Sequence, residues 1–335
     1  MNPFGISIII CIHNGASKIT PTLKALSEQT IPSGIPIELL IIDNASTDNT
    51  AIIAQKTWEI SGSPFPIKIL TEPKLGKANA LKNGYSSASY ELMLLCDDDN
   101  WLQPNYLNIV IALFREHPNI GLLGGYGKAF FETSEKPEWF DKWENCYVCG
   151  KHHRQNGFLA NRDYSIWGAG SVITKTVWNF IISNGFSFHN STKGGKAIAE
   201  DAELSMAISF TGYKLYFDDR LWFTHDLRGG RITWKNLIAQ QAANGKNNAI
   251  LCMYEIALNL KTNSNAYANY LFIKKTFEIS FRLLKSSLKR ENKPRQIYFS
   301  NILKELLFNA NKYKKISLES FNWINKVKNN PKILD

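Results

Sequence analysis

The stretch LMLLCDDDNWLQP, residues 92–104, passes from an apolar run to three adjacent aspartates. The apolar run has the composition of a buried strand. Three neighbouring carboxylates repel one another, so their position at the end of such a strand calls for a cation or a cationic ligand. Asp97 and Asp99 offer the oxygen ligands that Mg²⁺ or Mn²⁺ shares with phosphates and water. The alternative interpretation is an Asp-rich turn or N-cap before the next helix.

Short apolar runs alternate with helical patterns through about residue 125. This alternation is typical of crossover units, so we predict an α/β fold with a central, mainly parallel sheet flanked by helices. The predicted strands are residues 6–12, 37–42, 67–70, 91–96 and 121–123, and the predicted helices are 18–29, 49–60, 77–87 and 104–116. Ligands bind such sheets beyond the carboxyl ends of the strands. The polar segments HNGAS, DNASTDNT and DDDN follow the first, second and fourth strands, so we expect the site there.

The composition indicates a globular protein of the cytoplasm. The chain has 335 residues with 44% apolar content, enough for a full core. No apolar run approaches the roughly 18 to 20 residues of a membrane span, and the first residues lack the basic region of a signal peptide. The five cysteines are an odd number, which favours reduced thiols over a disulfide framework.

The excess positive charge lies in the C-terminal segment. Residues 261–335 contain 16 Lys and Arg against 5 Asp and Glu, whereas residues 1–260 contain 23 against 24. The pattern there is that of a basic amphipathic helix, which suits an anionic membrane surface. The alternative is a helical subdomain packed on the core with a solvated basic face. The apolar positions are Leu271, Phe272, Phe277, Phe281, Leu284 and Leu288, and the basic ones between them are Lys274, Lys275, Arg282, Lys285 and Lys289.

Six segments carry a resemblance to the family 2 glycosyltransferases, in order and approximate spacing. They are SIIICIHNGAS, LLIIDNASTDNT, EPKLGKANALKNGY, LLCDDDNWLQPNYL, WGAGSVITKTVW and AEDAELSMAISFTGYKLYFDDRLWFTH, and together they cover about residues 5–228. The resemblance implies a GT-A fold, a nucleotide-sugar donor, a divalent metal and inversion at the anomeric carbon. We accordingly expect a catalytic domain over residues 1–245 and a helical, basic extension over residues 246–335.

The family pattern also implies roles for single residues. Asp43 matches the position that recognises the base, commonly uracil, so a UDP-sugar is the expected donor. Asp99 matches the metal-binding position, and His225 resembles a late histidine that supplements the metal site in some members. Asp97 and the adjacent Asp98 fall near ribose and diphosphate. The first strand ends in Ile12, His13 and Asn14, where the family usually has Thr-Tyr-Asn next to the nucleotide. The segment that resembles the acceptor-side wall consists of Trp167, Gly168, Ala169 and Gly170.

Direct displacement needs a carboxylate to take the proton of the acceptor hydroxyl, and a metal to stabilise charge on the leaving diphosphate. Asp201, beside Glu200, matches the general base of the family. Because Asp201 opens a helical run, the helix N-terminus favours its ionised form. The alternative interpretation is that this pair only caps the first turn.

Four basic side chains and an asparagine have two interpretations each. Lys77 and Asn79 open a helix after a flexible glycine, where they can meet the nucleotide or its phosphates, or serve as ordinary helix-start residues. His225 by itself is by default a structural histidine. Arg228 and Arg231 suit phosphate or an anionic acceptor, or a solvated loop.

The expected function is an inverting glycosyltransferase that adds one sugar to a glycan or lipid-linked acceptor, on the cytoplasmic side and peripheral to the inner face of the cell membrane. A sugar-phosphate nucleotidyltransferase is a competing class, but CIHNGASKI is a poor match to its early phosphate-binding loop. The second alternative to a glycosyltransferase is a non-catalytic sugar-binding scaffold. Nothing resembles a nucleic-acid reading motif, so nucleic acid is not an expected partner. The segment CYVCGKHH, residues 146–153, is not expected to bind zinc, because adjacent histidines cannot easily both ligate so close to the CxxC pair.

Overall fold

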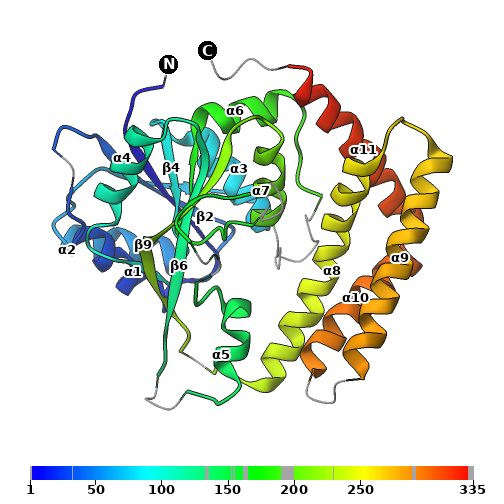
Figure 1. Ribbon diagram of the computed structural model, residues 1–335. Helices are drawn as coiled ribbons and strands as arrows, with labels where there is room; N and C mark the ends of the chain where they lie inside the picture. The colour runs from blue at the N-terminus through cyan, green and yellow to red at the C-terminus, as the bar shows by residue number, and fades with distance from the viewer. Residues whose placement is uncertain are drawn as a thin grey trace.

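The computed structural model describes residues 2–31, 33–132, 136–151, 153, 155–160, 165–189, 200–228, 230–288 and 292–330. Two parts lie side by side in Figure 1. One is a sheet with helices on both faces, and the other is a group of long helices, α8 to α11, that ends the chain. The predicted α/β class is confirmed.

The strands of the described residues form one nine-stranded sheet in the order β3-β2-β1-β4-β8-β6-β9-β5, with β7 paired to β9. The strands β3, β2, β1 and β4 are parallel neighbours, as predicted. β8 runs antiparallel to both β4 and β6, so the far half of the sheet is mixed. The bounds are β1 (Ile6–Ile12), β2 (Ile37–Asp43), β3 (Ile67–Thr71), β4 (Leu92–Leu95), β5 (Asn100–Leu102), β6 (Ile120–Phe130), β7 (Gly157–Phe158), β8 (Val172–Thr174) and β9 (Lys214–Asp226).

The first four helices, α1 to α4, begin and end close to the predicted positions. α3 packs so tightly that a Cβ atom on Gly84 would lie 2.6 Å from the side chain of Ile9. The bounds are α1 (Ile19–Ser27), α2 (Thr50–Ile60), α3 (Lys77–Ser87), α4 (Tyr106–Glu116), α5 (Phe140–Trp143), α6 (Lys175–Ser183) and α7 (Glu200–Ser209), with the 3₁₀ helix η1 at Glu144–Tyr147.

The isoleucines of β1 explain why this strand is central. Ile8 and Ile10 pack with α1 on one face of the sheet, and Ile9 packs with α3 on the other. All three are fully buried. A strand that is covered on both faces reads as a continuous apolar run, which is the pattern of parallel sheets. The polar residues after β1, β2 and β4 are therefore held at one edge by a rigid core.

The C-terminal helices have a core of their own. α8 (Trp234–Asn259), α9 (Asn265–Ser287), α10 (Lys293–Phe308) and α11 (Ala310–Lys328) bury apolar side chains between them. The predicted division between residues 245 and 246 falls inside α8, which is continuous. Gly245 lies in close contact with α10, since a Cβ atom there would be 2.3 Å from the carbonyl oxygen of Tyr298. A division at this position would pass through a packed helix, and the two predicted domains stay a prediction.

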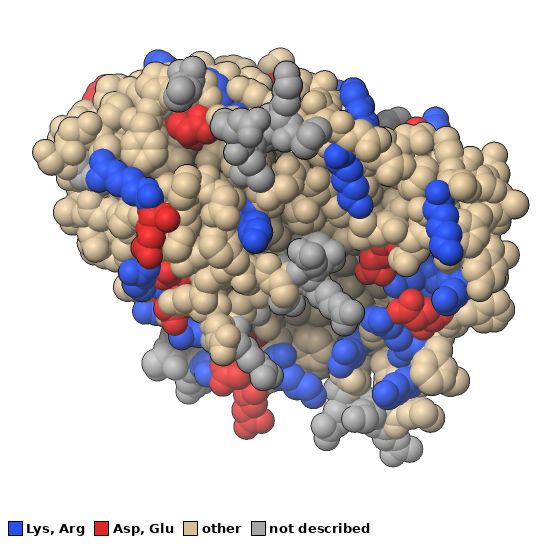
Figure 2. All heavy atoms as spheres, turned by 45° about the horizontal axis from the view of Figure 1, so that its top comes forward, with Lys and Arg blue, Asp and Glu red and all other residues tan. Residues whose placement is uncertain are grey.

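Two surface properties follow from the arrangement of the described residues. No described helix has both the length and the apolar content needed to cross a membrane. On the face seen in Figure 2, Lys and Arg side chains stand in separate groups, several of them beside Asp or Glu. On that face, the net charge of +10 is not gathered into one continuous patch.

Candidate active site

Two adjoining cavities lie at the edge of the sheet where β1 and β4 end. The larger, about 510 Å³, is lined by all three aspartates of the triplet together with His225 and Arg231, and we call it the Asp99 cavity. The smaller, about 290 Å³, is lined by residues that include Trp167, Glu200 and Asp201, and we call it the Asp201 cavity. Both cavities are lined by Lys77, Asp97, Val148 and Gln240.

Asp99 is held between two basic side chains, His225 near the end of β9 and Arg231 in the segment after it. Its Oδ2 accepts a hydrogen bond of 2.5 Å from Nη1 of Arg231, and its Oδ1 lies 3.5 Å from Nε2 of His225. Burial alone would raise the pKa of Asp99, but the hydrogen bonds and charges of His225 and Arg231 outweigh burial and lower it. Asp99 is therefore an ionised carboxylate in a buried place.

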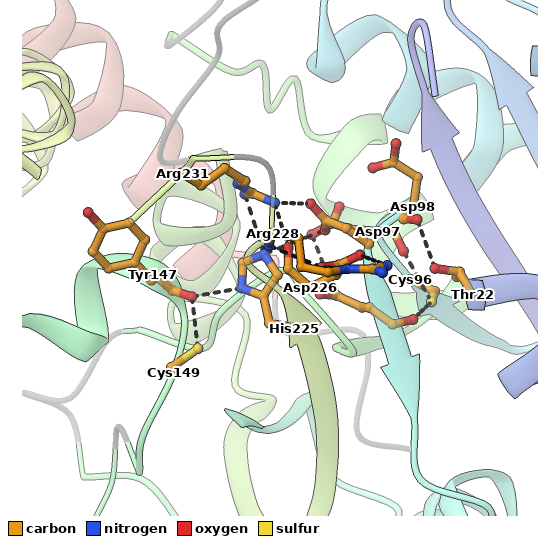
Figure 3. Close-up of polar contacts among 12 residues, drawn as sticks. Thr22, Cys96, Asp97, Asp98, Tyr147, Cys149, His225, Asp226, Arg228 and Arg231 are labelled. Atoms are coloured by element: carbon orange, nitrogen blue, oxygen red, sulfur yellow. Dashed lines mark hydrogen bonds and ion pairs between the residues drawn. The ribbon is translucent and has the colours of Figure 1, made fainter. Parts of the chain in front are cut away.

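The register of two strands brings His225 to Asp99. Asn100 on β5 lies opposite His225 on β9, and the amide of Asp226 donates to the carbonyl of Asp99 at 2.9 Å. Figure 3 shows the ring of His225 between Tyr147 and Arg231. Nδ1 of His225 lies 2.7 Å from the carbonyl oxygen of Tyr147, which can only accept, so Nδ1 carries a proton. Nε2 points to Asp99. When protonated it can donate to that carboxylate, and when deprotonated it offers a lone pair to a cation beside Asp99, as a metal-binding histidine does.

These two side chains fit a hard divalent cation that takes its other ligands from phosphate and water. Among the described residues, no group of three or more His, Cys, Asp or Glu side chains is placed to hold an ion. The protein would thus supply Asp99 and His225 alone. At present the guanidinium of Arg231 is the cation beside both, with Nη2 3.5 Å from Nε2 of His225.

Asp98 differs from its two neighbours. Its carboxylate points away from His225 and Arg231 in Figure 3, toward Gly15, where a Cβ atom would lie 2.8 Å from Oδ2. Burial and the charge of Asp99 raise the pKa of Asp98 to about 6. The three aspartates therefore do not act as one group, and Asp98 lies on the side of α1.

Lys77 joins the two cavities. Its Nζ lies 2.9 Å from Oδ1 of Asp97 and 3.5 Å from Oε1 of Glu200. Burial favours the neutral amine, but the two carboxylates outweigh it and raise the pKa of Lys77. Lys77 is the first residue of α3, and Gly76 before it has a φ of 135°, a backbone conformation that favours glycine.

Asp201 is anchored by two backbone amides. The amide of Gly168 donates to Oδ2 at 3.1 Å, and the amide of Ala202 donates to Oδ1 at 2.8 Å. Burial nevertheless raises the pKa of Asp201, because it outweighs these bonds and the charge of Lys77. We expected the helix N-terminus to favour the ionised form; the amide of Ala202 in the first turn does lower the pKa, but burial outweighs it. Asp201 is a stronger base than an exposed aspartate.

Glu200 is buried beside Asp201 but is held differently. Burial raises its pKa, the charge of Lys77 opposes the rise, and the charge of Asp201 adds to it. Its Oε2 is buried and accepts no hydrogen bond within the described part of the chain. Glu200 thus has one oxygen near Lys77 and one that has no partner among the described residues.

The predicted acceptor wall divides into two parts. Trp167, Gly168 and Ala169 line the Asp201 cavity, whereas Gly170 is absent from its lining. Gly170 has a φ of 71°, and its carbonyl accepts a hydrogen bond of 2.6 Å from the hydroxyl of Tyr106. Gly170 therefore shapes the turn that presents the other three.

The residues predicted for the base lie at the ends of β1 and β2, outside the two cavities. Nδ1 of His13 lies 2.8 Å from the carbonyl oxygen of Asn44. Asn14 accepts from the amide of Thr47 at 2.8 Å, and Asp43 accepts from the amide of Ser46 at 3.1 Å. These bonds join the loops after the two strands into one structure.

Two other predicted nucleotide contacts face elsewhere. The side chain of Ile12 is buried in the core. The side-chain amide of Asn79 donates to the carbonyl oxygens of Lys74 and Leu75, at 3.2 and 3.3 Å. Asn79 thus supports the loop before α3. Its assignment to the nucleotide stays a prediction.

The sequence analysis missed a polar face of α8. Gln240, Asn244 and Asn248 lie four residues apart and line the Asp201 cavity. The side-chain amide of Gln240 also donates to the carbonyl of Cys146 in η1. The spacing itself was a readable signal, because residues four apart share a helix face. The predicted boundary at residue 245 cut this face in two and hid it.

All five cysteines have free thiols, as expected of reduced cysteines. Burial raises the pKa of Cys146 to about 11 and that of Cys149 to about 12, so both thiols are protonated near neutral pH. His152, next to this CxxC pair, lies outside the described residues.

Residues 7–165 match the model of glycosyl transferase family 2. This match confirms the resemblance read from the motifs of that part of the chain. Two solved structures share the fold: Staphylococcus aureus TarS 1–349 in complex with UDP-GlcNAc, and the mannosyltransferase PcManGT from Pyrobaculum calidifontis in complex with GDP-Man and Mn²⁺. The first has a TM-score of 0.56 at 16% identity, covering 99% of this chain and 93% of that chain. The second has 0.55 at 13% identity, covering 98% and 87%. At these identities the likeness shows the fold alone, which is GT-A.

Curated relatives are also glycosyltransferases. The cholesterol galactosyltransferase of Borreliella burgdorferi is 22% identical over 233 residues, 70% of this chain and 63% of that protein. The poly-β-1,6-N-acetyl-D-glucosamine synthase of Staphylococcus epidermidis is 30% identical over 121 residues, 36% of this chain and 28% of that protein. The matched part of this chain therefore spans less than two thirds of the length of either relative.

Proposed function

We propose that the chain is an inverting glycosyltransferase that moves a sugar from a nucleotide-diphosphate donor to a hydroxyl group of a glycan or a lipid-linked acceptor. The observation that carries this proposal is that the Asp99 and Asp201 cavities share Lys77 and Asp97 in their lining. Asp99, a carboxylate suited to bind a cation, and Asp201, a carboxylate suited to accept a proton, thus line adjoining cavities. Metal-assisted single displacement needs this arrangement.

The donor that we favour is a UDP-sugar, since the TarS neighbour holds UDP-GlcNAc. The loops after β1 and β2 offer exposed polar groups to a base, with the stacking ring of His13 among them. Lys77 offers a cation to the phosphates. The residues that we assign to the nucleotide are His13, Asn14, Asp43, Lys77, Asp97 and Asp98, with Ile12 packed beneath them.

Asp99 and His225 are the side chains that would hold Mn²⁺ or Mg²⁺, and the PcManGT neighbour contains Mn²⁺. When bound, the metal supplies positive charge that stabilises the departing diphosphate. Arg231 would have to leave Asp99, after which its planar guanidinium is available to a phosphate of the donor.

Asp201 is the residue that we assign as general base, with Glu200 beside it. The acceptor oxygen forms a bond to the anomeric carbon while the bond from that carbon to the diphosphate oxygen breaks on the opposite face, which inverts the configuration. The hydroxyl proton passes to Asp201. The amides of Gly168 and Ala202 hold the carboxylate in one orientation, and burial strengthens it as a base.

The acceptor that the Asp201 cavity suits is an uncharged sugar. Trp167 offers a flat apolar surface, and the amides of Gln240, Asn244 and Asn248 can donate to and accept from hydroxyl groups. Asp97 and Glu200 would repel an anionic acceptor at this place. The relative named as a cholesterol galactosyltransferase supports an acceptor that resides in a membrane. We accordingly place the enzyme in the cytoplasm, on the inner face of the cell membrane.

The experiment that tests this function is calorimetric binding of UDP, GDP, dTDP and CMP to the purified protein, with and without Mn²⁺. We expect one diphosphate to bind with a clear dependence on Mn²⁺. Its sugar conjugate should then be consumed in the presence of a neutral glycan acceptor, with release of that diphosphate.

Two outcomes would replace the proposal. Release of pyrophosphate from a nucleoside triphosphate and a sugar phosphate would identify a nucleotidyltransferase. Binding of a sugar without metal dependence and without turnover, in a folded protein, would identify a sugar-binding scaffold.

A further inference from the structure

Helix α9 presents a row of large apolar side chains to solvent. Each is more than half exposed, and the spacing of three or four residues places them on one face of the helix. We call this row the α9 stripe; it consists of Tyr270 (58% exposed), Ile273 (53%), Phe277 (72%), Phe281 (67%) and Leu284 (60%), together with Leu288 (80%), the residue directly after the helix. Contiguous exposed apolar surface of this kind marks a binding surface for protein or lipid.

The opposite face of α9 fixes the orientation of the stripe. Phe272 and Ile279 are buried in the core of the C-terminal helices. Lys275 also points inward, where it pairs with Glu255 of α8 and with Glu278. The amphipathic pattern read from the sequence therefore combined residues of two helix faces, because Phe272 and Lys275 lie on the inward face of α9. α9 lies at the edge of the molecule in Figure 1, and its outer side faces away from the sheet.

A basic cavity lies at the end of the same helix. It measures about 290 Å³ and lies between the last turns of α9 and the first turns of α10, lined by Arg282, Lys285, Ser286, Asn292, Arg295 and Phe299. Arg282 pairs with Glu278 at 2.6 Å. Lys285 and Arg295 form no ion pair with any described residue, so their charges are available to an anion.

We propose that the α9 stripe inserts into the interfacial region of an anionic lipid bilayer and that the basic cavity takes the phosphate of a lipid headgroup. Apolar side chains beside unpaired Lys and Arg are what such a surface attracts. A second copy of the chain is disfavoured, since it would bring like charges together: residues 261–335 carry 16 Lys and Arg against 5 Asp and Glu. This binding surface does not depend on the catalytic proposal.

Flotation of the full-length protein with vesicles tests the proposal. We expect the protein to float with vesicles of phosphatidylcholine and phosphatidylserine, to float less as salt rises, and to stay unbound with phosphatidylcholine alone. Phe277→Ser and Phe281→Ser should each weaken binding by about tenfold or more. Lys285→Glu and Arg295→Glu should each weaken it by about fivefold or more.

Ile60→Ser is the matched control, because Ile60 is an exposed apolar residue of α2. It should leave vesicle binding unchanged. Circular dichroism and binding of the nucleotide establish that each variant is folded, independently of membrane affinity. If the protein binds both vesicle types equally, and neither salt nor Lys285→Glu nor Arg295→Glu changes this binding, the headgroup assignment is overturned.

Two further results would overturn the proposal. Concentration-dependent dimerisation that is lost in Phe277→Ser, without vesicle binding, would assign the stripe to a second copy. Binding of inorganic phosphate that is lost in Arg295→Glu, again without vesicle binding, would assign the cavity to a free anion.

Discussion

The guanidinium of Arg231 lies 2.5 Å from the carboxylate of Asp99, although the two residues are 132 positions apart in the chain. The arginine thus neutralises a carboxylate that we assign to a metal. A cation already occupies the charge-balancing position, so a metal and Arg231 compete for Asp99.

Arg231→Ala should therefore bind Mn²⁺ more tightly than the unchanged protein when no nucleotide is present. Loss of a charge-assisted hydrogen bond of about 1.5–3 kcal/mol corresponds to roughly a tenfold gain or more. A Mn²⁺ titration that is monitored by electron paramagnetic resonance measures this gain in affinity. Arg228→Ala is the control, because Arg228 pairs with Asp226. Weaker Mn²⁺ binding in Arg231→Ala would show that the arginine supports the site.

Asp99→Asn should abolish the part of nucleotide binding that depends on metal. The amide loses the negative charge that a hard cation requires. Asp98→Asn is the matched control, since Asp98 points toward Gly15 and should keep the metal dependence. Calorimetry with UDP and Mn²⁺ separates the two. Equal loss in both variants would argue that the triplet acts as one acidic group.

Asp201→Asn should keep the affinity for the donor and lose transfer by roughly 10² or more, as removal of a general base does. The asparagine is nearly the same size and can still accept from the amide of Gly168. Near-normal turnover in this variant would exclude Asp201 as the base. Single-turnover assays with saturating donor measure the chemical step.

The pH dependence of transfer should report the raised pKa of Asp201. Because a base must be ionised, activity falls as the pH drops through the pKa of Asp201. This fall occurs at a higher pH than for an exposed aspartate, whose pKa is about 3.9. The charge of Lys77 opposes the rise. Lys77→Met should therefore move the acidic limb of kcat/KM to higher pH. A limb that stays in place or moves to lower pH would contradict the proposed coupling.

Asn244→Ala and Asn248→Ala should raise KM for the acceptor while donor binding stays unchanged. Loss of one hydrogen bond of about 0.5–1.5 kcal/mol predicts an increase of roughly two- to tenfold for each. Asn259→Ala is the control on the same helix, because Asn259 is exposed and lies outside the lining of both cavities. An equal effect in all three variants would point to a loss of helix stability.

Local patterns in the sequence were enough for the first half of the fold. β1, β2 and α3 end within a residue of their predicted positions. Runs of β-branched residues and the polar residues that end them act over a few positions, so they are readable without tertiary structure. The same holds for the aspartates after β4, whose place at the edge of a parallel sheet follows from the alternation of elements.

The composition of the site was decided by tertiary structure. The pairing of β5 with β9 brings His225 to Asp99, and the packing of α8 places Asn244 beside the Asp201 cavity. The direction of the pKa shift of Asp201 also depends on burial, which outweighs the hydrogen bonds of Gly168 and Ala202 and the charge of Lys77. Contacts between distant positions and the loss of solvent are properties of the packed chain. The sequence by itself therefore determined the class of fold and the candidate carboxylates, and only the packed chain decided their partners and their basicity.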